Sequence, residues 1–287
     1  MAQQNPYRNP IIFARTHFDE TTGDIVHNGK IWIMEEDGSE QRQLTEGDSY
    51  DDHPALFSDG RHALYSEFNS THFSPSTPGG KLFKIDIYTG EKTIYAEKLG
   101  CTLHHVTISP IDDILMYQRN VGKHVYQRVE QNGEIYELPM RAINGIALKD
   151  SVIFMHEKNM GLSPRQVALV RMYGHGKDAR ATFLTNDACL HRRPAVSPDG
   201  EWMAWQTNVE GGEDEVYLAR VDGSEARNIT NAEGLDGHPW FSRDGKWIVF
   251  ESDRTGTMEI WKINLETLEQ HQLTFSGKAY SCRTPRW

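Results

Sequence analysis

The sequence predicts an all-β protein built as a six-bladed β-propeller with four antiparallel strands in each blade. Three observations predict this fold: an internal repeat of about 45 residues, an Asp-Gly turn at the same place in the clearest copies, and two chain ends that each supply part of one blade. The composition does not change along the 287 residues, so we expect a single propeller domain over residues 1–287.

The repeat is clearest in three segments that each contain a proline, a short apolar strand and an Asp-Gly turn. These segments are residues 53–60, 193–200 and 238–245. Asp and Gly tolerate the positive φ of tight turns, so each segment predicts a β-hairpin. Residues 105–112 form a weaker copy, and residues 145–155 form a degenerate fifth. A second hairpin later in each unit completes four strands, the number in a propeller blade.

The two ends of the chain predict how the ring closes. Residues 11–14 look like a second strand without a first, and residues 283–287 look like a first strand without a second. We expect both to lie in one blade, because their pairing removes sheet edges that would otherwise be exposed.

The charge and the cysteines exclude several classes of function. With 30 Lys and Arg against 41 Asp and Glu, the net charge of −11 opposes binding to nucleic acid. No apolar run is long enough for membrane insertion, and the polar amino terminus lacks a secretory signal. We therefore expect a cytoplasmic protein, or a periplasmic one if a signal peptide has been removed. The three cysteines are widely spaced and are expected to be free thiols.

Two family resemblances rest on these repeats. Residues 239–256, with the Asp244-Gly245 turn, resemble the repeats of TolB-like (WD40-like, PD40) β-propellers, and the likeness extends over nearly the whole chain. Such proteins are scaffolds that bind other proteins or ligands, so this resemblance implies a fold more than an activity. Residues 103–117 resemble the corresponding blade of oligogalacturonate lyases. Those propeller enzymes cleave uronate sugars by β-elimination, which implies a divalent cation such as manganese or calcium.

Aligning the repeats brings equivalent residues to a common axis, and many of them are histidine or charged. The residue before the repeat's proline is, blade by blade, His53, His105, Asn144, Arg193, His238 and Thr284. The two positions upstream add Asp52, His104, His191, Arg192, Asp236 and Arg283. We expect a polar axial funnel whose ligand-binding residues include Asp52, His53, Asn144, Asp236 and Arg283. Alternatively, these side chains are only the solvated lining of a water-filled axis.

Two functions from different classes fit such a funnel. The favoured one is a recognition module that binds a small anionic ligand or a protein partner, with Arg192 or Arg193 clamping a carboxylate. The alternative is a metal-assisted oligouronide lyase. The lyase resemblance implies that His104 or His105 acts near the scissile sugar, and that His191 and His238 hold the metal. Asn144 stands where that family has a ligand histidine, so the expected metal set is incomplete.

Overall fold

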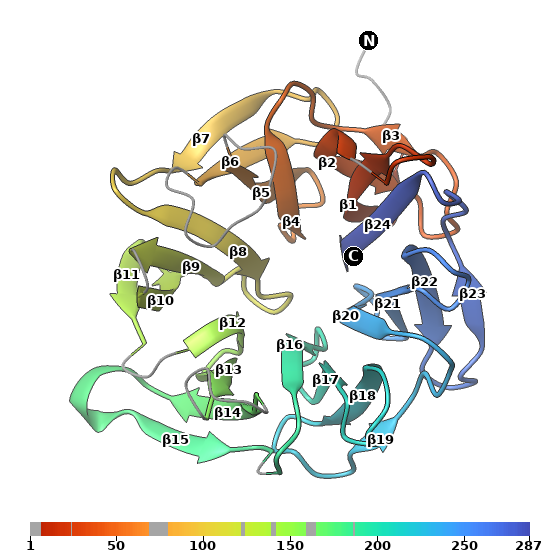
Figure 1. The fold of residues 1–287 in the computed structure, drawn as a ribbon. Coiled ribbons are helices and arrows are strands. Elements are labelled where there is room, and N and C mark those ends of the chain that lie inside the picture. The colour runs from red at the N-terminus through yellow and green to blue at the C-terminus, as the bar shows by residue number, and fades with distance from the viewer. Residues whose placement is uncertain are drawn as a thin grey trace.

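Six four-stranded antiparallel sheets stand around a common axis in the computed structural model, which describes residues 7–23, 25–68, 80–121, 124–138, 142–158, 165–185 and 187–287 (Figure 1). The strands of the first three blades, from the inner edge outward, are β24 (Tyr280–Arg286), β1 (Ile11–Phe18), β2 (Ile25–Met34) and β3 (Arg42–Gln43); β4 (Tyr50–Leu56), β5 (His62–Phe68), β6 (Lys81–Asp86) and β7 (Lys92–Ala96); β8 (Thr102–Ile108), β9 (Leu115–Val121), β10 (His124–Gln131) and β11 (Glu134–Glu137).

The other three blades repeat the arrangement. Their strands, in the same order, are β12 (Ala142–Ala147), β13 (Ser151–Glu157), β14 (Val167–Tyr173) and β15 (Arg180–Phe183); β16 (His191–Val196), β17 (Trp202–Thr207), β18 (Glu215–Arg220) and β19 (Arg227–Asn228); β20 (Asp236–Phe241), β21 (Trp247–Ser252), β22 (Glu259–Asn264) and β23 (Gln270–Gln272). The predicted six-bladed propeller is thus confirmed. Within the described ranges, no helix is long and apolar enough to cross a membrane.

The ring closes as the two chain ends predict. Strand β24 pairs antiparallel with β1, with Ile12 opposite Arg286 and Thr16 opposite Ser281. The last described strand is therefore the inner strand of the first blade, and Figure 1 shows β24 beside β1 there. This pairing ties residues that are more than 250 positions apart in sequence, and it leaves no open sheet edge at the ring closure.

The Asp-Gly turns between the first and second strands owe their geometry to both residues. Gly60, Gly200 and Gly245 have φ of 65°, 74° and 70°, a region that glycine adopts without steric cost. Each preceding aspartate accepts a backbone N–H two residues on: the Oδ1 to N distances are 2.8 Å for Asp59, 3.0 Å for Asp199 and 3.1 Å for Asp244. The turns that the sequence predicts are thus closed locally.

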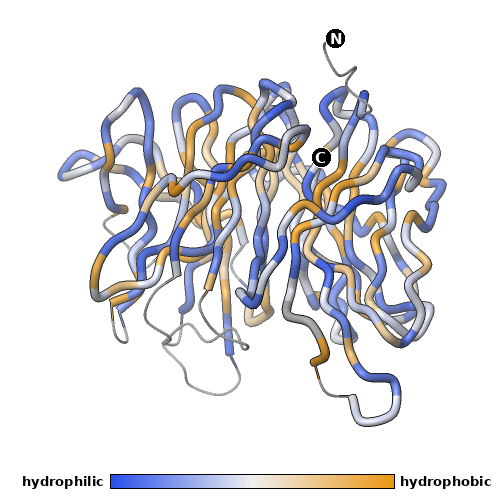
Figure 2. Tube along the Cα trace, turned by 90° about the horizontal axis from the view of Figure 1, so that it is seen from above, coloured by the Kyte–Doolittle hydropathy of each residue, from blue (hydrophilic) through white to orange (hydrophobic). Residues whose placement is uncertain are grey.

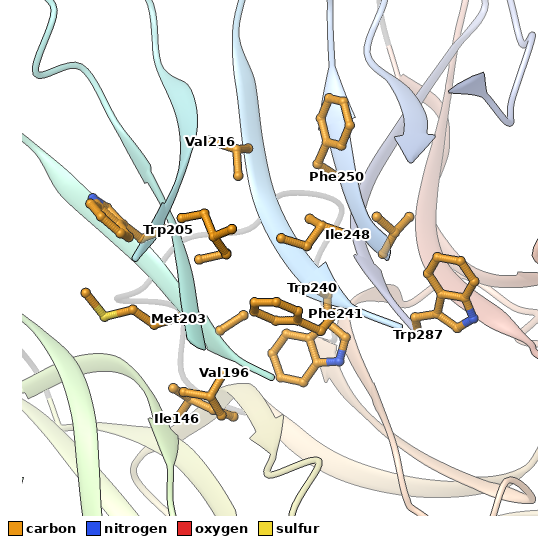
Figure 3. Close-up of a cluster of buried hydrophobic side chains, with 14 of the residues drawn as sticks. Ile146, Val196, Met203, Trp205, Val216, Trp240, Phe241, Ile248, Phe250 and Trp287 are labelled. Atoms are coloured by element: carbon orange, nitrogen blue, oxygen red, sulfur yellow. The ribbon is translucent and has the colours of Figure 1, made fainter. Parts of the chain in front are cut away.

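The core lies between adjacent blades. Hydrophobic residues concentrate in the strands, whereas hydrophilic residues concentrate in the loops at both faces (Figure 2). The largest cluster joins blades four, five, six and one, and Figure 3 shows its aromatic members Trp205, Trp240, Phe241, Phe250 and Trp287. Because each blade buries its faces against its neighbours, the positions of the inner strands around the axis are fixed.

Candidate functional site

Every inner strand is interrupted at the position that the repeat alignment singles out. The pairing of inner and second strands shifts register between Asp52 and Ala55, and equivalent shifts occur in the other five blades. The residue inside each bulge has a left-handed backbone, with φ between 43° and 57°; these residues are His53, His105, Asn144, Arg193, His238 and Thr284. The six positions aligned from sequence are therefore structurally equivalent.

The left-handed backbone at these positions carries an energetic cost. A non-glycine residue in this region is disfavoured by about 1–2 kcal/mol, because its Cβ crowds the following carbonyl. All six bulge residues carry a side chain. Strain that persists at one place in a fold is an observation from which a functional role can be inferred.

The bulges surround a small cavity on the axis, which we call the axial cavity. Its lining comes from all six inner strands and includes His53, His105, Thr107, Asn144, Arg193, His238, Trp240 and Arg286. About 20 Å³ of this cavity is accessible to the centre of a water-sized sphere. A single water molecule needs roughly 10–15 Å³ by this measure, so the cavity admits one carboxylate or a similarly small group, and not a sugar ring.

The histidines in and beside the axial cavity form a compact group. The ring centroids of His53 and His105 are 3.8 Å apart, and those of His53 and His238 are 6.2 Å apart. Burial, the neighbouring His53 and the nearby Arg193 lower the pKa of His104 to about 3. Burial also lowers the pKa of His105 well below its usual value, and burial together with Arg193 lowers the pKa of His238 to about 3. These three imidazoles are therefore neutral at pH 7.

Two buried carboxylates lie behind the histidines. Glu251 accepts a hydrogen bond from His238 Nδ1 at 2.7 Å and from the Thr284 backbone N–H at 2.8 Å. Burial opposes its ionisation, but His238, Arg283 and the Thr284 N–H together lower the pKa of Glu251 to about 2. Because His238 donates through Nδ1, its neutral Nε2 presents a lone pair, and this atom is buried without a partner among the described residues.

Asp52 supports His53 in a similar way. One Asp52 oxygen lies 3.1 Å from His53 Nδ1, and the other accepts the Thr284 hydroxyl at 3.1 Å. Burial opposes ionisation of Asp52, but the charge and hydrogen bonds of His53 lower the pKa of this carboxyl group. Both carboxylates of the site are thus occupied by hydrogen bonds from their neighbours.

Two arginines supply positive charge to the cavity. Within the described part of the chain, the Arg193 guanidinium makes no hydrogen bond or ion pair, and burial lowers its pKa to about 10. Arg286 stacks on Trp240 with its guanidinium carbon 4.5 Å from the ring centroid. Burial and repulsion from Arg193 lower the pKa of Arg286 to about 10. Both groups remain charged at pH 7, and each disfavours the charge of the other.

Five of the eleven predicted site residues line the axial cavity, and six do not. The five are His53, His105, Asn144, Arg193 and His238. Of the rest, Asp52 backs His53, and His104 is buried with its ring centroid 4.4 Å from that of His105. Arg283, which is exposed, donates to the Ser281 hydroxyl at 3.0 Å.

The other three upstream residues have structural partners. Arg192 forms an ion pair with the buried Asp214, which also accepts Gln206 at 2.6 Å. Asp236 is fully buried and pairs with Arg254 at 2.6 Å.

His191 is engaged through both ring nitrogens. Its Nε2 lies 2.8 Å from an Asp187 oxygen, and its Nδ1 accepts the Trp205 indole N–H at 3.1 Å. Its role as a metal ligand stays a prediction. Across the described ranges, no three His, Cys, Asp or Glu side chains meet in a group that could hold a metal ion. The divalent cation implied by the lyase resemblance therefore lacks a complete ligand set in this structure.

The sequence reasoning missed Arg286 and Trp240. Both stand two residues after the bulge position, at the end of β24 and within β20. The bulge turns three successive positions toward the axis, so the lining extends downstream of the repeat's proline, whereas the alignment was read upstream. Reading the aligned residues after the proline would have found both.

Comparison with known proteins confirms the TolB-like resemblance. Residues 176–287 match the family described as TolB beta propeller domain. An uncharacterized protein, Atu1656, of Agrobacterium fabrum is 31% identical over 81 residues, which are 28% of this chain and 27% of that protein. A TolB homolog of Chlorobium luteolum is 31% identical over 110 residues, which are 38% of this chain and 21% of that protein. The matches thus span about a quarter of these relatives' length.

Solved structures resemble the whole ring. TolB from Acinetobacter baumannii superposes with a TM-score of 0.75 at 15% identity, over 97% of this chain and 66% of that one. An oligogalacturonate lyase in complex with manganese gives a TM-score of 0.50 at 17% identity, over 93% of this chain and 74% of the lyase. At such identities the likeness shows a shared fold and carries no activity with it.

Proposed function

We propose that this propeller is a recognition module whose axial cavity binds the carboxylate, or an equally small anionic group, of a ligand or a partner protein. The observation that carries the proposal is that the guanidiniums of the half-buried Arg193 and the buried Arg286 face one small cavity. An anion between them would relieve their mutual repulsion and would satisfy donors that lack an acceptor.

The surrounding groups favour an anion over a cation. The carboxylates of Asp52 and Glu251 compensate the arginine charges through space, but their bonds go to His53, His238 and Thr284, and no hydrogen bond or ion pair joins them to Arg193 or Arg286 among the described residues. The neutral His105 can act as a donor or as an acceptor. The volume of about 20 Å³ limits the buried part of the ligand to a small head group, and the remainder must lie outside the cavity.

Acetate is the simplest probe of this site, with acetamide as its uncharged counterpart. We expect acetate at constant ionic strength to raise the melting temperature of the protein by roughly 2–4 °C at ten times its dissociation constant, since one bound ligand then adds about 1.4 kcal/mol. Acetamide should have no such effect. Arg193→Gln should abolish the shift, because it removes the unpaired charge.

Arg283→Gln is the matched control for this experiment. It removes an arginine from β24 whose side chain is exposed and bonded to Ser281, and it should keep the acetate shift. Equal shifts for the wild type and Arg193→Gln, or no difference between acetate and acetamide, would contradict the proposal.

The lyase remains a second candidate because His105 and Arg193 line the same cavity. With the uronate carboxylate in the cavity and the sugar ring outside it, a neutral imidazole can take the proton from the carbon next to the carboxylate while a guanidinium stabilises the charge that develops. The bond to the oxygen of the neighbouring sugar then breaks, which leaves the unsaturated uronide. The candidate rests on these two residues, since no group of three cation ligands is found among the residues that the structure describes. The test is the ultraviolet absorbance of unsaturated uronide formed from uronate oligosaccharides, with and without manganese or calcium. A signal that His105→Ala and Arg193→Ala both abolish would favour the lyase over the binding module.

The location of the protein is a separate proposal. The expected cytoplasmic location gains no support from the comparisons, and the similarity to TolB favours the periplasmic alternative. Fractionation of cells that express the native gene would test it, because a periplasmic protein is released by osmotic shock.

A further inference from the structure

A second cavity lies at the end of the axis where the Asp-Gly turns gather, and the proposed function does not use it. We call it the turn-side cavity. Its apolar lining includes Phe57, Pro110, Pro198, Trp240, Phe241 and Trp287. About 180 Å³ is accessible to the centre of a water-sized sphere. An engineered apolar protein cavity of roughly 150 Å³ binds benzene, so this cavity has room for one aromatic ring.

Trp287 forms one wall of this cavity. The residue is 5% exposed, and its indole Nε1 is buried with no partner in the described part of the chain. Because this nitrogen is closed to solvent-sized molecules, the ring offers the cavity an apolar surface and no donor. Figure 3 shows Trp287 with Trp240 and Phe241, its neighbours in the cavity lining.

The charge at the cavity favours an anion. Arg243 lines it, and its only bond within the described ranges is to the Phe57 carbonyl at 3.3 Å, with no acidic partner. Asp113 is the acidic residue in the lining, and its two oxygens accept the Ser58 N–H at 2.9 Å and the Ser58 hydroxyl at 2.6 Å. The carboxylate is therefore engaged, whereas the guanidinium is available.

We propose that the turn-side cavity binds a small aromatic carboxylate, with the ring against Phe241 and Trp287 and the carboxylate on Arg243. The apolar walls would bury the ring, and Arg243 would pair with the charge. This site is distinct from the axial cavity, although both contact Trp240.

The test uses 3-phenylpropionate as the probe, with 3-phenylpropan-1-ol as its uncharged counterpart and propionate as the version without a ring. Isothermal titration calorimetry should show saturable binding of 3-phenylpropionate, about tenfold weaker binding of the alcohol, and no measurable binding of propionate at the same concentrations. Binding should also change the tryptophan fluorescence, because Trp240 and Trp287 line the cavity.

Arg243→Gln and Lys246→Gln form a matched pair of variants. Both residues are exposed cations on the same turn, but only Arg243 lines the cavity. Arg243→Gln should weaken 3-phenylpropionate roughly threefold to tenfold and leave the alcohol unchanged, whereas Lys246→Gln should change neither.

Three outcomes would overturn the proposal: no saturable binding to the wild type, equal affinities for the wild type and Arg243→Gln, or equal effects of Arg243→Gln and Lys246→Gln. Arg193→Gln should bind 3-phenylpropionate as the wild type does. This arm separates failure of the turn-side site from failure of the axial site.

Discussion

The axial cavity and the turn-side cavity are formed by the same inner strands, yet their left-handed residues differ. Three hairpin turns at the turn-side end place glycine at positive φ, and the turn of the third blade uses Asp113 at φ 54°. Aspartate is one of the residue types that tolerate this region. At the axial cavity, all six left-handed positions carry a side chain, including an arginine and a β-branched threonine.

This difference shows that one repeat serves two purposes. Where the chain only has to turn, the residue with the lowest steric cost is used. Where the side chain points into a cavity, the backbone strain is retained. This implies that the contribution of the side chain to function outweighs the cost of the strain. The two cavities also differ in charge: the axial cavity buries charged groups, whereas the turn-side cavity is mainly apolar.

Loss of strand β24 should damage both cavities and have the largest effect. Removing residues 281–287 deletes Arg286 from the axial cavity, Thr284 from its bonds to Glu251 and Asp52, and Trp287 from the turn-side cavity. It also exposes the edge of β1, so we expect a loss of more than about 5 kcal/mol in the free energy of unfolding. Urea denaturation measures it. A truncated protein that melts like the full chain would show that the ring does not depend on this strand.

Acidification should act through the axial cavity. His104 and His238, with pKa values lowered to about 3, and His105, with a strongly lowered pKa, stay neutral in the folded protein below the ordinary histidine pKa of 6.5. As the pH falls below 6.5, the unfolded chain binds these three protons and the folded protein does not. Stability should therefore decrease with falling pH, by up to about 1.4 kcal/mol per pH unit for each proton.

Urea denaturation between pH 7 and pH 5 checks this pH dependence. His105→Asn removes one of the three titrating histidines. The slope of the unfolding free energy against pH should therefore fall by the contribution of one proton, up to about 1.4 kcal/mol per pH unit. The Glu251 carboxylate, with its pKa lowered to about 2, should add a further loss only below about pH 4.5. A stability that is constant from pH 7 to pH 5 would mean that the histidines are accessible to protons in the folded state.

Glu251→Gln should be more damaging than the corresponding change at the turn-side cavity. The amide cannot accept from both His238 and Thr284 as the carboxylate does, and the buried arginines lose a compensating charge. We expect a loss of about 3 kcal/mol in the free energy of unfolding. Asp113→Asn, which affects bonds to the exposed Ser58, should cost less than about 1 kcal/mol. If urea denaturation gave equal losses of unfolding free energy for Glu251→Gln and Asp113→Asn, the electrostatic difference between the two cavities would be contradicted.

The backbone contrast gives the smallest expected effects, of opposite sign at the two ends. Arg193→Gly removes the strain of a left-handed backbone at a residue with a side chain, and it also removes a desolvated charge. It should therefore raise the free energy of unfolding by about 1 kcal/mol and still abolish acetate binding. Gly245→Ala should lower the free energy of unfolding by about 1 kcal/mol because alanine is strained at positive φ. Steric contact adds nothing, since the added Cβ would lie 3.7 Å from its nearest atom, Pro198 Cδ. If Arg193→Gly is destabilising, the side chain has a structural role.

The sequence by itself determined the propeller, its six blades, the closure through the two chain ends and the six bulge positions. These features repeat along the chain, so local patterns of proline, apolar strand and Asp-Gly turn are enough to reveal them. His53, His105 and His238 were placed on one cavity in this way, and the structure brings them there.

Only the tertiary structure decided which charged residues meet. Arg192 and Arg193 are neighbours in sequence, but Arg192 pairs with Asp214, whereas Arg193 faces the axis without a partner in the described part of the chain. Arg286 reaches the cavity because the bulge in β24 turns the strand and because Trp240, from another blade, supports its guanidinium. Such partners lie on different strands or blades, and a repeat alignment gives the position of a residue without giving the direction of its side chain or the group that it meets.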